Sequence, residues 1–326
     1  ATGYGLKDKL LFKNSIKYLQ SLQQPFYAKY ITVTNHFPYT LDDEDKDPNF
    51  QTTNTGDSNV DNYFVTAHYL DQSIQEFFNY LQKTGLDKKS IIMIYGDHYG
   101  ISNSENTSLA SVLGKSADDW TDFDNAQLQR VPLMFVIPGT GHGKVYHTYG
   151  GEVDVLPTLL HLLGISSKRY IQFGTDLFSS KHNQVVAFRN RDFVTPTYTS
   201  VGGTIYNNKT GKEAKLTKKQ QEKLKKDQTF VNEELTLSDS LNEKNLLRFY
   251  HPKGFKNVNP ADYNYSNGLK RAQRIEKKKG IKSTSIYSEN GDRSTVDDYS
   301  TDAPEQSHSS TDSNRIKITN PDANNK

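Results

Sequence analysis

Residues 90–102, SIIMIYGDHYGIS, join an apolar run to a polar ending. The run 91–95 has the composition of a buried strand, and it stops at Gly96, directly before Asp97 and His98. Such a strand presents a carboxylate beside an imidazole at the edge of a sheet, a donor set that suits Mn²⁺, Mg²⁺ or Zn²⁺ in phosphate-ester chemistry. Asp97 and His98 are therefore candidate metal ligands. The alternative is a structural role, in which Asp97 caps a turn and His98 is packed.

The elements before this strand predict an α/β unit. An amphipathic helix is expected over 5–22, and residues 26–34, FYAKYITVT, are rich in the aromatic and β-branched side chains of a strand. Residues 59–84 keep a helical apolar period for about seven turns, with Gly85 at the end. Strand, loop, helix and strand in this order predict a right-handed crossover in a parallel sheet. Because function collects at the carboxyl ends of parallel strands, His36 is expected near the candidate ligands. A lone loop histidine is otherwise more often a surface or hydrogen-bonded residue.

The sequence after the strand 91–95 predicts further helices and strands, which include small antiparallel elements. Residues 103–129 are polar and are expected to form a lid or a short helix. The remaining predictions are strands over 131–137 and 185–188, a helix over 154–163 with Asp154 as N-cap, a hairpin over 198–206 around Gly202 and Gly203, an exposed helix over 212–235 and a docked segment over 246–250. The fold class expected is α/β, a mixed sheet flanked by helices with a small C-terminal antiparallel region.

The end of the chain changes in composition. The whole chain is polar, with 34% hydrophobic and 24% charged residues and a mean hydropathy of -0.77. After about Tyr265 the basic stretch KRAQRIEKKKGIK is followed by a Ser-, Thr-, Asp- and Asn-rich stretch over 283–326. We therefore expect a folded domain over residues 1–265 and a disordered polar tail over 266–326.

Composition and charge exclude several function classes. The net charge of +2, from 40 basic and 38 acidic residues, does not indicate a nucleic-acid partner. The absence of cysteine excludes disulfides and thiol catalysis. No apolar run approaches the roughly 20 residues that span a bilayer, and no signal peptide is evident, so a soluble chain is expected.

The remaining histidines show no partner pattern. His68 and His161 lie within predicted helices and are expected to be structural. The others are assigned to the surface, namely His142, His147, His182, His251 and His308.

Five stretches together resemble a known family. They are ITVTNHFPYTL at 31–41, GDSNVDNYFVTAHYLDQSI at 56–74, IMIYGDHYGIS at 92–102, GEVDVLPTLLHLLGI at 151–165 and FGTDLFSSKHNQVVAFRNRDFV at 173–194. The chain up to about Tyr265 resembles the extracellular domain of lipoteichoic acid synthases, which are polyglycerol-phosphate transferases of the sulfatase and alkaline-phosphatase superfamily. The resemblance implies that residues 1–265 are the C-terminal part of a sulfatase-like catalytic domain, and the tail lies outside it.

The resemblance implies a sulfatase-like fold and an enzyme of Gram-positive cell-wall biogenesis. Family members carry N-terminal transmembrane helices and an outward-facing catalytic domain. They take glycerol phosphate from phosphatidylglycerol, carry it on a threonine beside Mn²⁺, with Mg²⁺ as the alternative ion, and add it to glycolipid-anchored polyglycerol phosphate. Asp97 and His98 fall on two of the family's metal ligands, and His36 falls on the histidine that contacts glycerol phosphate.

The sequence departs from the family at its beginning. The family's threonine nucleophile and a metal-binding glutamate lie upstream of the position that matches Ala1, so no catalytic residue is assigned in this chain. We expect the parent protein at the extracellular face of the membrane, and this chain alone to be inactive and secreted or wall-associated. The alternatives are a related phosphodiesterase or glycan phosphoglycerol transferase, and a non-catalytic wall-associated binding fragment.

Overall fold

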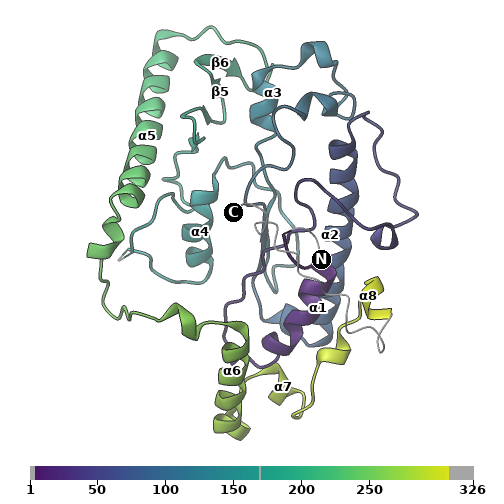
Figure 1. Cartoon of the computed structure of the whole chain (residues 1–326). Helices are drawn as coiled ribbons and strands as arrows, with labels where there is room; N and C mark the ends of the chain where they lie inside the picture. Colours follow the sequence, from purple (N-terminus) through teal and green to yellow (C-terminus); the bar gives the residue numbers. More distant parts are fainter. Residues whose placement is uncertain (1–3, 169, 308–326) are drawn as a thin grey trace, which may run out of the picture.

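Two helices, α1 (Asp8–Leu19) and α2 (Ser58–Lys83), pack against each other in the computed structural model, which describes residues 4–168 and 170–307 (Figure 1). Both lie where the apolar period predicts them. Asp57 caps α2 by accepting hydrogen bonds from the backbone N–H groups of Asn59 and Val60, at 3.0 and 3.3 Å. Gly85 follows with a φ of 72°, a left-handed conformation that glycine adopts without steric cost.

A two-stranded antiparallel sheet includes part of the stretch 90–102. Strand β1 (Ile92–Tyr95) pairs with β2 (Leu133–Val136), so that Ile92 faces Val136 and Tyr95 faces Leu133. Both strands were predicted. The close approach explains Gly96, because a Cβ there would lie only 2.7 Å from the Cβ of Val131.

The predicted strand over residues 26–34 is not formed. The segment is extended and outside any ladder of the described residues, and Tyr27 and Ile31 are 73% and 64% exposed. A strand needs a partner edge as well as β-forming residues, and no described segment supplies one here. The parallel crossover into β1 is therefore also absent, and the pairs of both sheets are antiparallel.

A second sheet contains four short strands in sequential order. The predicted hairpin is confirmed: β5 and β6 are joined by Gly202 and Gly203, whose φ values of 57° and 85° fit a two-residue hairpin turn. The strands are β3 (Val186–Ala187), β4 (Phe193–Val194), β5 (Tyr198–Val201) and β6 (Thr204–Asn207). Helix α5 (Lys218–Glu243) packs against this sheet through Val231, which is fully buried.

Two local predictions need correction. Helix α4 (Val155–Leu162) is present and Asp154 occupies the predicted N-cap position, but its carboxylate makes no capping hydrogen bond. The carboxylate instead accepts from the backbone N–H groups of Gly151 and Thr175, at 2.9 and 2.6 Å. The segment 246–250 was expected to dock, yet Leu247 is 52% exposed and Phe249 is 70% exposed. Residues 103–129 contain short 3₁₀ turns and α3 (Asp122–Gln127).

The prediction of a disordered tail from residue 266 is wrong for residues up to 307. This part contains α6 (Tyr265–Lys279), α7 (Ile286–Glu289) and α8 (Pro304–Ser307). Ile286 and Tyr299 are 3% and 2% exposed and pack with α1 and α2 in one core.

Specific polar contacts hold the polar segment 266–307 against α1 and the residue that follows it. Lys13 Nζ donates to the carbonyl oxygens of Val296 and Tyr299, at 2.8 and 2.9 Å, and Gln20 Oε1 accepts from the Thr295 N–H at 2.7 Å. Composition could not reveal these pairings. Residues 308–326 of the predicted tail lie outside the described residues.

The predicted mixed α/β class is confirmed. The two small antiparallel sheets lie among helices, with α5 along one side of the molecule and α1 and α2 along the other (Figure 1). Within residues 4–168 and 170–307, none of the helices is long and apolar enough to cross a membrane.

Candidate functional site

Asp97 and His98 lie directly after β1, as predicted. The Nε2 atom of His98 is 3.7 Å from an Asp97 carboxylate oxygen, and the two side chains are 56% and 72% exposed. A packed role for His98 is therefore excluded. Neither side chain is enclosed, so both are available to a ligand.

His36 is brought to the same place by a different part of the chain. Its ring centroid is 5.8 Å from that of His98, and the two rings are perpendicular. The three residues predicted from sequence thus share one site, although their parallel-sheet context is not formed.

The hydrogen bonds of the His36 and His98 imidazoles indicate which ring nitrogen of each residue can bind a ligand. His98 Nδ1 lies 2.7 Å from the carbonyl oxygen of Tyr99, and His36 Nδ1 lies 2.9 Å from that of Phe37. Because a carbonyl can only accept, each Nδ1 carries the proton and donates it. The Nε2 lone pair of each neutral ring is consequently free to bind a metal ion or accept a proton.

Hydrogen bonds to α1 and α2 hold the loop that contains His36 in place. Before it, the Asp8 carboxylate accepts from the backbone N–H groups of Val33 and Thr34, at 3.0 and 3.4 Å. Within it, Asn35 Oδ1 accepts from the buried Thr66 hydroxyl of α2 at 2.8 Å. Burial raises the pKa of Asp8, against the hydrogen bonds that stabilise its charge. The anchors hold the end of segment 26–34 in place although the segment itself is unpaired.

Tyr39 joins the His36 loop to the loop after β1. Its buried hydroxyl donates to the carbonyl oxygen of Gly100. Burial, with a smaller effect of Tyr63 and nearby charges, raises the pKa of Tyr39 to about 12. Gly100 also lies against Tyr63, where an added Cβ would come within 2.5 Å of the ring. This close packing sets the distance between His36 and His98.

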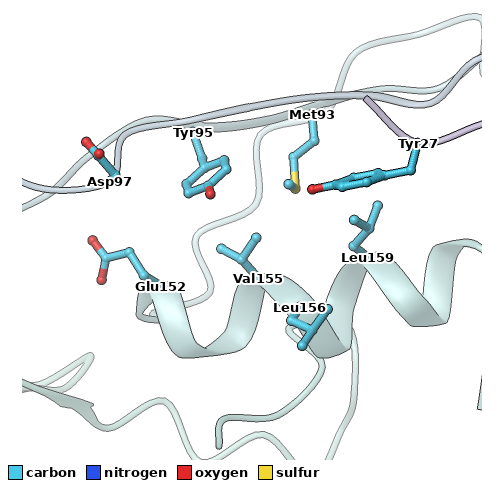
Figure 2. A pocket seen from close by; sticks show the side chains of 8 residues that line it. All are labelled: Tyr27, Met93, Tyr95, Asp97, Glu152, Val155, Leu156 and Leu159. Carbon is cyan, nitrogen blue, oxygen red and sulfur yellow. The ribbon is translucent and has the colours of Figure 1, made fainter. Parts of the chain in front are cut away.

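A cleft of about 350 Å³ adjoins Asp97 between β1 and α4, and we call it the β1–α4 cleft (Figure 2). Asp97 and Glu152 stand on opposite walls at one end, and the rest of the lining is largely apolar. The other lining residues are Tyr27, Met93, Tyr95, Val155, Leu156 and Leu159. Sequence reasoning missed Glu152 and Tyr27, because no spacing in the sequence connects either residue to Asp97.

Asp97 and His98 offer two of the ligand types that a divalent cation binds. One carboxylate and one imidazole with a free Nε2 are suitable Mn²⁺ ligands. In the part of the chain that the structure describes, no group of three or more His, Asp or Glu side chains is placed to hold a metal ion. Asp97 and His98 therefore fit as part of a metal site and need further ligands to complete it.

The other histidines form structural contacts or are exposed to solvent. His68 pairs with Asp47 at 2.9 Å, and His161 pairs with Asp176 at 2.8 Å, as expected of structural residues. His182 was assigned to the surface, but its side chain is 4% exposed and lies 2.6 Å from the Thr175 hydroxyl. His142, His147 and His251 are exposed as predicted, and His308 lies outside the described residues.

The fold and the sequence place the chain in a defined class. The sulfatase family profile matches residues 2–165, half of the chain, and the chain belongs to this family.

More specific similarity is found to lipoteichoic acid synthases. The chain is 54% identical to lipoteichoic acid synthase 2 of Bacillus subtilis over 263 residues, which cover 81% of the chain and 39% of that protein. It is 46% identical to the lipoteichoic acid synthase of Staphylococcus aureus over 266 residues, which cover 82% of the chain and 40% of that protein. The chain thus matches about two fifths of the length of these relatives.

A solved structure supports the same relationship. The crystal structure of the lipoteichoic acid synthase LtaP from Listeria monocytogenes superimposes with a TM-score of 0.62 and 26% sequence identity, covering 72% of this chain and 59% of that chain. Both the family and the fold expected from the sequence are confirmed.

Proposed function

We propose that this chain is part of a metal-dependent phosphoglycerol transferase that builds the polyglycerol-phosphate chain of lipoteichoic acid from phosphatidylglycerol. The observation that carries the proposal is the proximity of His36 to His98 and of His98 to Asp97, which lines the β1–α4 cleft, in a chain that is 54% identical over 81% of its length to a lipoteichoic acid synthase. The named activity of those relatives supports a role in lipoteichoic acid synthesis.

The three site residues take distinct roles in this proposal. Asp97 and the Nε2 atom of His98 would hold Mn²⁺, or Mg²⁺ in its place. When bound, the cation supplies positive charge that favours ionisation of a nearby hydroxyl group and offsets charge on phosphoryl oxygens. His36, whose Nε2 faces no carbonyl of its own loop, hydrogen-bonds the glycerol-phosphate group when protonated.

In this proposal, the nucleophile and the remaining metal ligands come from a part of the longer relatives that lies outside their match with this chain. No third ligand joins Asp97 and His98 among the described residues, and the relatives are much longer than the match. We propose that a threonine and a glutamate from that segment complete the site at the outer face of the cell membrane. The isolated chain would then bind Mn²⁺ weakly and turn over no lipid.

A chimera tests the proposal directly. The N-terminal part of Bacillus subtilis lipoteichoic acid synthase 2, up to its match with this chain, is joined to residues 1–326 and supplied with Mn²⁺ and labelled phosphatidylglycerol. We expect diacylglycerol release and polymer formation by the chimera and none by residues 1–326 alone. Asp97→Ala and His98→Ala should each lower the rate by at least about 1,000-fold, because an incomplete site loses the charge stabilisation that the ion supplies.

Controls separate this function from the alternatives. His147→Ala removes an exposed histidine that has no role in the proposed site and should leave the rate unchanged. Turnover by residues 1–326 alone, or full activity of either Asp97→Ala or His98→Ala, would contradict the assignment. Release of diacylglycerol without polymer would favour a related phosphodiesterase or a transferase with another acceptor. An inactive chimera that still binds cell-wall polymer would favour the non-catalytic binding fragment.

A further inference from the structure

Residues 246–282 concentrate positive charge in a chain that is otherwise slightly acidic. This segment holds ten Lys and Arg against two Asp and Glu, whereas the whole chain holds 40 against 38. It runs from the end of α5 to the end of α6, along the lower edge of the molecule in the view of Figure 1. The proposed transfer chemistry uses none of these residues.

The same segment exposes large apolar side chains. Phe249, Phe255 and Tyr265 are 70%, 58% and 82% exposed, and Ile281 is completely exposed. Val258 and Tyr263 are also more than half exposed. Several large apolar side chains that are exposed within one short segment are typical of an interaction surface.

Helix α6 divides into a packed face and a basic face. Leu269, Ala272 and Glu276 are partly buried and recur at the spacing of one helix face. Glu276, the single acidic residue of the helix, accepts hydrogen bonds from the Ser283 and Ser285 hydroxyls and is thereby turned towards the body of the protein.

The charged residues on the opposite face of α6 are all cations. The exposed residues Lys270, Arg274, Lys277 and Lys278 share this face, and none of them forms an ion pair with a carboxylate of the described residues. A solvated helix of ordinary composition looks different. Helix α5 is also lysine-rich, but its 26 residues interleave five Lys with six Asp and Glu.

We propose that residues 246–282 are a docking surface for an anionic lipid bilayer. The basic face of α6 would lie on the headgroups, while the exposed aromatic and aliphatic side chains enter the interface. In this binding mode, the affinity for the membrane is the sum of two contributions. Basic residues are attracted to the anionic headgroups, and apolar side chains are buried at the acyl boundary. A soluble polyanion or a nucleic acid would use the charge but would leave the apolar side chains in water, so the combination favours a membrane.

Vesicle sedimentation tests this surface without any need for turnover. Residues 1–326 are mixed with phosphatidylcholine vesicles that contain or lack phosphatidylglycerol, at low salt and at about 0.15 M salt. We expect binding to the phosphatidylglycerol vesicles alone, weakened by salt. The triple substitution K270Q/R274Q/K277Q should reduce it about 100-fold, since each basic residue contributes about fivefold near an anionic surface.

A matched control and a second variant decide the outcome. K218Q/K219Q/K225Q removes the same charge from exposed positions of α5 and should change binding less than about twofold. F255S/I281S should weaken binding about tenfold while keeping the salt dependence, because it removes the apolar contribution alone. Thermal unfolding and circular dichroism verify that each variant is folded.

Three results would overturn the proposal. One is equal loss in the α5 and α6 variants, which would indicate general charge attraction. The second is equal binding to vesicles without phosphatidylglycerol. The third is F255S/I281S binding as tightly as the unchanged chain while soluble polyglutamate competes fully, which would show a polyanion site in place of a membrane surface.

Discussion

Around α1 and α2, apolar side chains are buried and charged ones are paired, whereas around β1 and β2 apolar side chains remain exposed. In the helical region, Ile16 and Tyr299 are 0% and 2% exposed. In the strand region, Tyr27 is 73% exposed and Met134 of β2 is 49% exposed. The helical region thus contains a closed core, and the strand region holds the candidate chemistry.

The difference shows how stability and function are divided in this chain. A closed core tolerates little change, because each lost contact leaves a cavity or an unpaired group. Substitutions in the open cleft beside Asp97 should change the stability of the protein little. The candidate chemistry of this cleft depends on the positions of a few polar atoms. Substitutions in the two regions should therefore separate cleanly into effects on folding and effects on the site.

Matched tyrosine truncations give the largest expected contrast in stability. Tyr299→Ala should lower the free energy of unfolding by about 3–5 kcal/mol, since a buried aromatic side chain leaves a cavity in the α1–α2 core. Tyr27→Ala should change it by less than about 0.5 kcal/mol, because that ring is mostly in water. Urea unfolding of both variants measures the contrast, and equal losses would refute the division between the two regions.

A buried lysine offers a second test of the helical region. Lys7 is 2% exposed and pairs with Asp45 and Glu305; burial opposes its charge, but these carboxylates outweigh burial and raise its pKa. Lys7→Met should cost about 3–5 kcal/mol by leaving a buried carboxylate without its cation.

The exposed pair of Lys46 and Asp43, at 2.7 Å, supplies the control. Lys46→Met should leave the free energy of unfolding nearly unchanged, because solvent screens an exposed ion pair. Thermal unfolding of the two variants under identical conditions compares them, and a Lys7→Met variant as stable as Lys46→Met would show that the buried pair is energetically neutral.

Tyr39 connects the regions and gives the smallest effect. Tyr39→Phe removes its hydrogen bond to Gly100 and should cost about 1 kcal/mol near neutral pH. The pKa of Tyr39 is raised to about 12 in the folded protein, against 10.0 ordinarily. Its contribution is therefore complete below pH 10 and is lost as the pH rises towards 12, since the unfolded chain releases the proton first.

Unfolding measured at alkaline pH tests the direction of this pH dependence. The unchanged protein should lose stability more steeply than Tyr39→Phe between pH 10 and pH 12, by up to about 1.4 kcal/mol per pH unit for one proton. Parallel pH profiles of the two proteins would mean that the Tyr39 hydroxyl is not held in its buried, protonated form.

The sequence by itself determined the family, α1, α2, the strands and hairpin with strong local patterns, and the grouping of His36 with Asp97 and His98. These features rest on local periodicity, turn chemistry and contiguous motifs, which any short window of sequence displays. Tertiary structure alone decided the unpaired state of residues 26–34, the order of residues 266–307 and the position of Glu152 opposite Asp97. The physical reason is that ladder pairing, burial of sparse apolar residues in a polar segment and the walls of a cleft depend on partners far away in the sequence, and composition does not identify those partners.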